Sequence, residues 1–215
     1  MTRTVAPIVA PIVEVNPVEP DEGKLQRALE VLRGGGLLAF PTDTLYGIGC
    51  AFGQAESAER IGKLRGIDTS KRPFTLLLPD LGALPHYAVV NEPAYRILSR
   101  IFPGPYCAEL VAKGKIVGFP AAEERPTIGV RIPKSRLCEK LLWRLTRPIL
   151  TVTAKSPDGK TLTTAQMIQE EYGEKLDLIL DGGELAGPPS TVVSLVDEWM
   201  AVLREGRGPT DRVRN

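Results

Sequence analysis

The sequence predicts an α/β protein built as one domain around an open sheet of mixed parallel and antiparallel strands. Segments with helical periodicity alternate with short apolar runs from one end of the 215 residues to the other, and no internal repeat interrupts them. Such alternation is typical of a sheet covered by helices. A chain of this length that is 43% hydrophobic has enough apolar residues for one sizeable core.

The helices are predicted from apolar residues spaced three and four apart and from residues that cap helix ends. Leu25, Ala28, Leu29 and Leu32 lie on one face of a helix over residues 21–33. The glycines at 34–36 supply the left-handed conformation that ends a helix. The same reasoning predicts four more helices, over residues 54–65, 91–102, 135–145 and 164–171.

Strands are predicted where short apolar or alternating runs are bounded by glycine, proline or polar turns. They are expected over residues 37–40, 74–78, 106–112, 127–133, 148–153, 176–180, 190–195 and 199–203.

The ends of the chain are expected to differ from the domain between them. Residues 1–16 are apolar but broken by prolines, and we expect an arm that lies on the edge of the domain. The domain is expected to span residues 17–208. A polar tail over residues 209–215 is expected to be loose.

Composition excludes several classes of protein and of site. The 27 Lys and Arg against 26 Asp and Glu leave a net charge of +1, so any basic site for nucleic acid must be local. The single histidine, His86, argues against a histidine-based metal site, and we expect no bound metal of that kind. Three cysteines without a CxxC pair fit reduced thiols in a cytoplasmic protein. No apolar run approaches the roughly 20 residues of a membrane-spanning helix.

Residues 34–47, GGGLLAFPTDTLYG, deliver hydroxyls and a carboxylate at the end of a buried strand. Thr42, Thr44 and Tyr46 therefore follow the strand at a position where open α/β sheets usually bind ligands. The alternative is an ordinary Asp/Thr turn, which this stretch alone fits equally well. Hydroxyls also lie at the end of a second predicted strand, as Thr151 and Thr153, and at the start of a third, as Ser190 and Thr191.

Clustered cations accompany these hydroxyls and favour a ligand that carries phosphate. They are Lys63, Arg65, Lys71, Arg72, Arg131, Lys155 and Arg204. Arginine binds phosphate oxygens in a bidentate manner, and lysine acts as a movable point charge. For the cations of residues 63–72, a solvated helix end fits equally well because Lys and Arg suit the helix dipole. No GxxxxGKS/T or GxGxxG motif occurs, so the residues indicate an anion or nucleotide site that works by positioning and charge neutralisation.

An ordered set of motifs resembles the signature of the YrdC-like family, the threonylcarbamoyl-AMP synthases of tRNA modification. The first is GGLLAFPTDTLYG over residues 35–47. The others follow in the family's order, as KLR at 63–65, PGPY at 103–106, GVRIP at 129–133, PSTVV at 189–193 and REG at 204–206. The resemblance extends from about residue 17 to residue 208, which is nearly the whole chain.

The resemblance implies a twisted mixed sheet curled around a deep, positively charged cavity. It implies that L-threonine, bicarbonate and ATP, with Mg²⁺, react there to give pyrophosphate and threonylcarbamoyl-AMP, the donor for threonylcarbamoyladenosine in tRNA. Lys63 and Arg65 are the implied catalytic residues, which would neutralise the triphosphate. The implied contacts to the amino acid are Thr42, Thr44, Tyr46 and Arg131. The implied contacts to the nucleotide are Lys63, Arg65, Thr151, Thr153, Lys155, Ser190, Thr191 and Arg204, with Ser190 and Thr191 also suited to the carboxylate.

Three departures from the synthase pattern resemble the YciO branch of the family. Thr153-Ala154-Lys155 stands where synthases carry Ser-x-Asn, so a side chain that only donates hydrogen bonds replaces an amide. Gly66 replaces the usual proline, and a Tyr-Cys-Ala-Glu-Leu strand follows residues 103–105 in place of a Leu-Thr-rich one. Two alternatives to a synthase stay open. One is a protein of this branch that binds tRNA or double-stranded RNA without synthase activity, and the other acts hydrolytically on threonylcarbamoylated tRNA.

Overall fold

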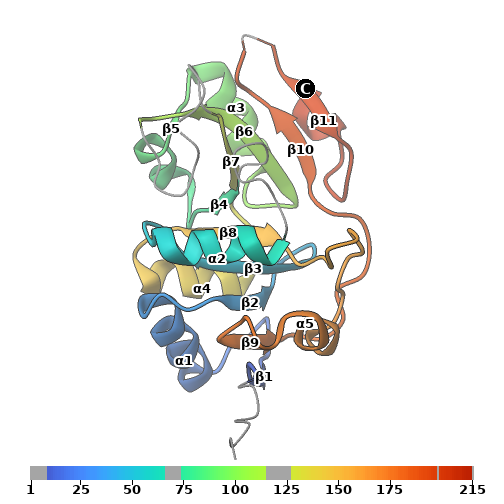
Figure 1. Cartoon of the computed structure of the whole chain (residues 1–215). Helices are drawn as coiled ribbons and strands as arrows, with labels where there is room; N and C mark the ends of the chain where they lie inside the picture. The colour runs from blue at the N-terminus through green and yellow to red at the C-terminus, as the bar shows by residue number, and fades with distance from the viewer. Residues whose placement is uncertain (1–8, 66–73, 115–126, 198, 215) are drawn as a thin grey trace, which may run out of the picture.

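The computed structural model describes residues 9–65, 74–114, 127–197 and 199–214, with the backbone alone at Arg65. Within these ranges eleven strands form one mixed sheet in the order β1-β9-β2-β3-β8-β4-β7-β6-β10-β11, with β5 paired to β6. The strands turn from nearly horizontal at β2 and β3 to steep at β6 and β10, so the sheet is strongly twisted (Figure 1). The predicted open α/β sheet of mixed strands is confirmed.

The strands are β1 (Ile12–Glu14), β2 (Leu38–Pro41), β3 (Tyr46–Ala51), β4 (Thr75–Leu77), β5 (Ala88–Val89), β6 (Tyr106–Ala112), β7 (Thr127–Arg131), β8 (Ile149–Thr153), β9 (Leu178–Asp181), β10 (Thr191–Ser194) and β11 (Ala201–Arg204). The α-helices are α1 (Glu22–Arg33), α2 (Ala55–Arg65), α3 (Glu92–Ile101), α4 (Arg136–Leu145), α5 (Ala165–Tyr172) and α6 (Asp211–Arg214), and a 3₁₀ helix, η1, spans Leu81–His86.

Local sequence accounts for where the helices begin. The side chains of Asp21, Asn91, Ser135 and Thr164 accept hydrogen bonds from backbone N–H groups three residues on, at the starts of α1, α3, α4 and α5. After α1, Gly35 adopts a φ of 84° in the turn that leads into β2. All five predicted helices are confirmed. Within the described ranges, no helix combines the length and apolarity needed to cross a membrane.

The strand β3 begins at the last two residues of the predicted site stretch and continues to Ala51, and no strand was predicted there. Glycine is a poor strand former, and it fills every second position at the start of β3, so the pattern carries no strand signal. The neighbouring strand β8 explains why glycine is needed. A Cβ atom at Gly47 would lie 2.9 Å from Thr151 Oγ1, and one at Gly49 would lie 2.7 Å from the Leu150 carbonyl oxygen. β2 and β3 thus form an antiparallel hairpin, connected by residues 42–45.

Both ends of the described chain lie against the domain. β1 pairs in parallel with β9, so residues 12–14 of the expected arm lie at one edge of the sheet. The expectation of a loose tail is wrong, because residues 211–214 form α6 and Val213 is buried. The Tyr106 hydroxyl also donates a hydrogen bond of 2.9 Å to the Pro209 carbonyl oxygen. A short polar tail can therefore be anchored by one apolar residue.

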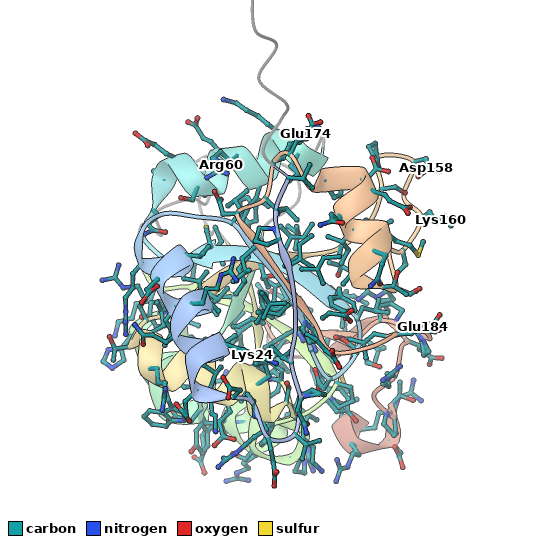
Figure 2. The ribbon with its side chains drawn as sticks, turned by 90° about the horizontal axis from the view of Figure 1, so that it is seen from below. Lys24, Arg60, Asp158, Lys160, Glu174 and Glu184 are labelled. Atoms are coloured by element: carbon teal, nitrogen blue, oxygen red, sulfur yellow. The ribbon has the colours of Figure 1, made fainter. Side chains whose placement is uncertain are left out.

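Two apolar clusters lie on opposite faces of the sheet. α1 and α4 supply Leu29 and Leu141 to the smaller cluster, against Leu38, Leu77 and Ile149 of the strands. Residues of α2, α3 and α5 belong to the larger cluster on the other face. Figure 2 shows the division from below, with α2 (marked by Arg60) and α1 (marked by Lys24) on opposite sides of the strands. The smaller cluster extends from β9 only to β4, so α1 and α4 leave the same face open over β7, β6 and β10.

Candidate functional site

A cavity of about 260 Å³ lies on the sheet face where the cover by α1 and α4 ends. Side chains alternate between the two faces of a strand, so every second residue of β8, β4, β7 and β6 faces this cavity. The paired residues Thr151, Thr75 and Gly129 form a row across three strands, which continues to Glu109 on β6. Gly129 leaves this row open, since a Cβ atom there would lie 3.3 Å from Cys107 Sγ.

Three hydroxyls meet where the β2–β3 connection borders the cavity. Thr42 Oγ1 donates a hydrogen bond of 2.7 Å to the Leu45 carbonyl oxygen and accepts one of 3.1 Å from the Thr44 backbone N–H. Thr44 Oγ1 lies 3.3 Å from Thr42 Oγ1 and 3.4 Å from Ser190 Oγ, which comes from the start of β10. All three side chains are buried or nearly so, and all three residues line the cavity. The structure thus brings together Thr42, Thr44 and Ser190.

Asp43 fixes this connection in place. One carboxylate oxygen pairs with an Arg131 guanidinium nitrogen at 2.6 Å, and the other accepts a 3.0 Å hydrogen bond from the Lys134 backbone N–H. Arg207 donates a 3.1 Å hydrogen bond to the Asp43 carbonyl oxygen. The two paired side chains are only 8% exposed for Asp43 and 12% for Arg131. The carboxylate at the end of the first strand therefore acts as an internal brace for the site.

The two predicted arginines of the cavity are held differently. Arg131 is charge-paired with Asp43, and its Nε is buried with no hydrogen-bond partner among the described residues. Arg204 donates a 2.8 Å hydrogen bond to the Ser190 carbonyl oxygen and has no carboxylate partner among the described ion pairs. Both side chains border the cavity, with Thr151 and Thr153 along another side. The structure therefore places these four predicted residues together.

The side chains of Tyr46 and Thr191 point to the opposite face of the sheet, because each residue alternates along its strand with one that lines the cavity. Tyr46 alternates with Gly47 along β3, and its ring belongs to the larger apolar cluster although the residue borders the cavity. Its hydroxyl donates to the Gly183 carbonyl oxygen at 2.7 Å, and burial raises the pKa of Tyr46 to about 12. Thr191 is fully buried, and its Oγ1 donates to the Gly208 carbonyl oxygen at 2.6 Å. The structure does not bring either hydroxyl to the cavity.

The predicted lysines also lie away from the described lining of the cavity. Lys63 is 80% exposed on α2 and pairs with Glu59 at 3.7 Å. Lys155 follows β8, and its backbone carbonyl oxygen accepts a 2.7 Å hydrogen bond from the Tyr172 hydroxyl. The side chain of Arg65 and residues Lys71 and Arg72 lie outside the described part of the chain.

Three polar or ionisable residues that line the cavity were not predicted as site residues from the sequence: Thr75, Cys107 and Glu109. Cys107 and Glu109 alternate along β6, a strand that was predicted with its correct bounds. The alternation indicates that Cys107 and Glu109 share one face of β6. Which face lines the cavity follows only from the pairing of β6 with β7 and β10. Burial raises the pKa of the Cys107 thiol, with the nearby charge of Arg131 opposing this, so the thiol is a neutral group at neutral pH.

A larger cavity, of about 560 Å³, lies between η1 and the start of α4. Its lining is mostly apolar, and two of its charged residues, Arg136 and Glu139, pair with each other at 2.8 Å. Ser135 is the one hydroxyl residue among its described lining residues, beside Lys134 and Arg136, whereas several threonines line the smaller cavity. Among the described residues, no group of three or more His, Cys, Asp or Glu could hold a metal ion.

The fold and the smaller cavity define a class of protein. A twisted mixed sheet presents hydroxyls and arginines to a cavity whose lining suits a small ligand with an anionic group. The chain belongs to the Sua5/YciO/YrdC family, whose model, described as "Telomere recombination", matches residues 30–206. The predicted resemblance is therefore confirmed.

Relatives fall into two groups. A Haemophilus influenzae protein described as uncharacterized is 34% identical over 91% of this chain and 95% of its own length, and Escherichia coli YciO, also described as uncharacterized, is 32% identical over 90% and 94%. A Pyrococcus abyssi threonylcarbamoyl-AMP synthase is 29% identical over 90% of this chain and 57% of its own length.

Solved structures give the same two groups. The crystal structure of E. coli YciO matches with a TM-score of 0.87 and 30% identity, over 95% of this chain and 99% of that chain. The crystal structure of P. abyssi Sua5 complexed with L-threonine matches with a TM-score of 0.84 and 28% identity, over 95% of this chain and 60% of that chain. The chain thus has the fold of both YciO and a threonine-binding relative.

Proposed function

We propose that this protein joins L-threonine, bicarbonate and ATP into threonylcarbamoyl-AMP, with release of pyrophosphate, as the donor for tRNA modification. The observation that carries the proposal is the convergence of Thr42, Thr44 and Ser190 on one cavity with Arg204. The chain also belongs to a family whose members include named threonylcarbamoyl-AMP synthases, and the P. abyssi relative has a structure complexed with L-threonine.

The residues of the cavity suit this chemistry. Hydroxyl groups can donate hydrogen bonds to the carboxylates of N-carboxythreonine, and an arginine can neutralise the charge of the attacked phosphate. No activated nucleophile is needed, because holding the carbamate in line with the α-phosphate can lower the activation barrier by about 7 kcal/mol or more. Mg²⁺ would enter with the triphosphate and be held mainly by phosphate oxygens and water.

Lys63 and Arg65 are part of the proposal as ligands of the triphosphate. They lie in the last turn of α2, and Phe74, the next described residue along the chain, lines the cavity. Lys63 is held by one exposed ion pair with Glu59, a pair of the kind worth about 0.3–0.5 kcal/mol, so a bound triphosphate would easily displace it. A cytoplasmic location, supported by three free cysteines, is also part of the proposal.

The test is pyrophosphate release by the full chain with ATP, L-threonine and bicarbonate, omitting each in turn. We expect release only when all three are present. Arg204→Ala should lower the rate at least tenfold, because it removes a charge from the cavity. The matched control is Arg96→Ala, since Arg96 is exposed on α3 and its ion pair within the described ranges is with Glu92. Lys63→Ala is expected to lower the rate as well.

Two results would count against the proposal. Release that does not depend on threonine, or that Arg204→Ala and Arg96→Ala leave equally fast, would show that this cavity does not perform the reaction. No release, together with tRNA binding that weakens steeply as salt is raised, would favour the RNA-binding alternative.

A further inference from the structure

Glu109 places a carboxylate in a cavity that is otherwise suited to anions. It is the only acidic residue among the described residues that line the cavity, where the charged groups are Arg131, Arg204 and Glu109. Its position on β6 sends the side chain to the cavity face, as for Cys107 two residues earlier. An acidic side chain beside a site for phosphate and carboxylate groups would repel them, so its presence calls for a ligand group of the opposite kind.

The pairing of charges within the cavity leaves Glu109 unneutralised. Arg131 lies diagonally from Glu109 across β6 and β7, yet its guanidinium pairs with Asp43 at 2.6 Å. Among the described residues, Glu109 accepts one hydrogen bond, of 3.0 Å from Thr127 Oγ1, and forms no ion pair. With Arg131 and Asp43 compensating each other, the described lining of the cavity presents one positive group, Arg204, and one negative group, Glu109.

These two groups lie at a separation that a small zwitterion can bridge. Arg204 pairs with Val192 of β10, and Val192 pairs with Cys107 of β6, two residues from Glu109. Two strand spacings and two residues along a strand put the Cα atoms of Arg204 and Glu109 about 12 Å apart. An arginine and a glutamate side chain that both border one cavity can converge across this distance onto a ligand only a few atoms wide.

We propose that the cavity recognises its amino acid substrate as a zwitterion, with Glu109 binding the α-ammonium group and Arg204 the carboxylate side of the ligand. The inference rests on the proposed function, because it names how the threonine of that reaction is bound. Glu109 is then a specificity-determining residue. An ammonium group donates three hydrogen bonds, and a carboxylate is acceptor-only, so this carboxylate discriminates for an incoming amino acid and against its analogue with a hydroxyl at the same place.

The test measures binding of two ligands to the full chain by calorimetry: L-threonine and its analogue in which a hydroxyl replaces the α-amino group. We expect the wild type to bind threonine at least tenfold more tightly, since a hydrogen bond to a charged group contributes about that factor. Glu109→Gln should reduce this ratio to about twofold or less, because the amide keeps the hydrogen bond from Thr127 and loses the charge.

The matched control is Glu174→Gln, which makes the same change at an exposed position after α5 (Figure 2). Its amine-to-hydroxyl ratio should equal that of the wild type. Melting temperatures show that each variant is folded. A Glu109→Gln protein that is folded and keeps the wild-type ratio overturns the inference while threonine binding itself still stands. A wild type that binds no threonine overturns the proposed function and this inference with it.

Discussion

Replacement of Asp43 by alanine should destabilise the protein at the site. The carboxylate of Asp43 accepts hydrogen bonds from the Arg131 guanidinium and the Lys134 backbone N–H, and it is only 8% exposed. Removing it leaves the Arg131 charge uncompensated in a place that is 12% exposed, where Nε is already without a partner among the described residues. Breaking one side of a buried ion pair typically costs about 3–5 kcal/mol.

The expected loss at Asp43 is somewhat smaller, about 2–4 kcal/mol of the free energy of unfolding, because water reaches part of Arg131. Asp43→Asn should lose about half as much, since an amide oxygen can still accept one of the two hydrogen bonds. Urea unfolding measures both, with the transition midpoint shifting and the m-value unchanged.

The control is Glu22→Ala, which removes a partner of Lys140 and Arg144 whose side chain is 58% exposed. Exposed pairs contribute about 0–1 kcal/mol, so this variant should lose less than 1 kcal/mol. If Asp43→Ala is no less stable than Glu22→Ala, the bracing role assigned to Asp43 is refuted.

Three further predictions separate the cavity from its support. Thr191→Val should lose about 1–3 kcal/mol of stability, because it leaves the Gly208 carbonyl and the Gly206 N–H without the Thr191 hydroxyl. Ser190→Ala should instead lower pyrophosphate release with little loss of stability. The reverse pattern in melting and activity assays would contradict the faces assigned to these two side chains. Gly129→Ala should weaken threonine binding in calorimetry by placing a methyl group on the cavity floor, and unchanged affinity would argue against ligand contact there. Burial raises the pKa of the Cys50 and Cys138 thiols from 9.0 to about 12, so only unfolded thiols ionise near pH 9. The free energy of unfolding should therefore fall as pH rises from about 9 to 12, and urea midpoints of a double cysteine-to-alanine variant should fall less steeply; equal slopes would contradict this.

The helices were predictable because their signals are local. Asp21, Asn91, Ser135 and Thr164 each cap a helix through a hydrogen bond to a backbone group three residues away, and such contacts can be read from spacing alone. β3 was not predictable, because its glycines are required by contacts with β8, which is about 100 residues further along the chain.

The site was predictable by region and less so by residue. Thr44 and Tyr46 are two positions apart in one motif, yet one hydroxyl reaches the cavity and the other bonds to the turn after β9. That difference depends on where the β2–β3 turn ends and β3 begins, and residue type does not reveal it. Ser190 and Thr191 differ in the same way at the start of β10. Glu109 was not predicted as a site residue, because its proposed role depends on Arg131 forming its ion pair with Asp43 instead.

The most direct test of the proposed function is the product itself. The full chain is incubated with ATP, L-threonine and ¹³C-labelled bicarbonate, and the nucleotides are analysed by mass spectrometry. The proposed function predicts threonylcarbamoyl-AMP that carries the label, with much less of it from Arg204→Ala than from Arg96→Ala. ATP converted without any labelled threonine adduct, or an adduct formed equally by both variants, would contradict it.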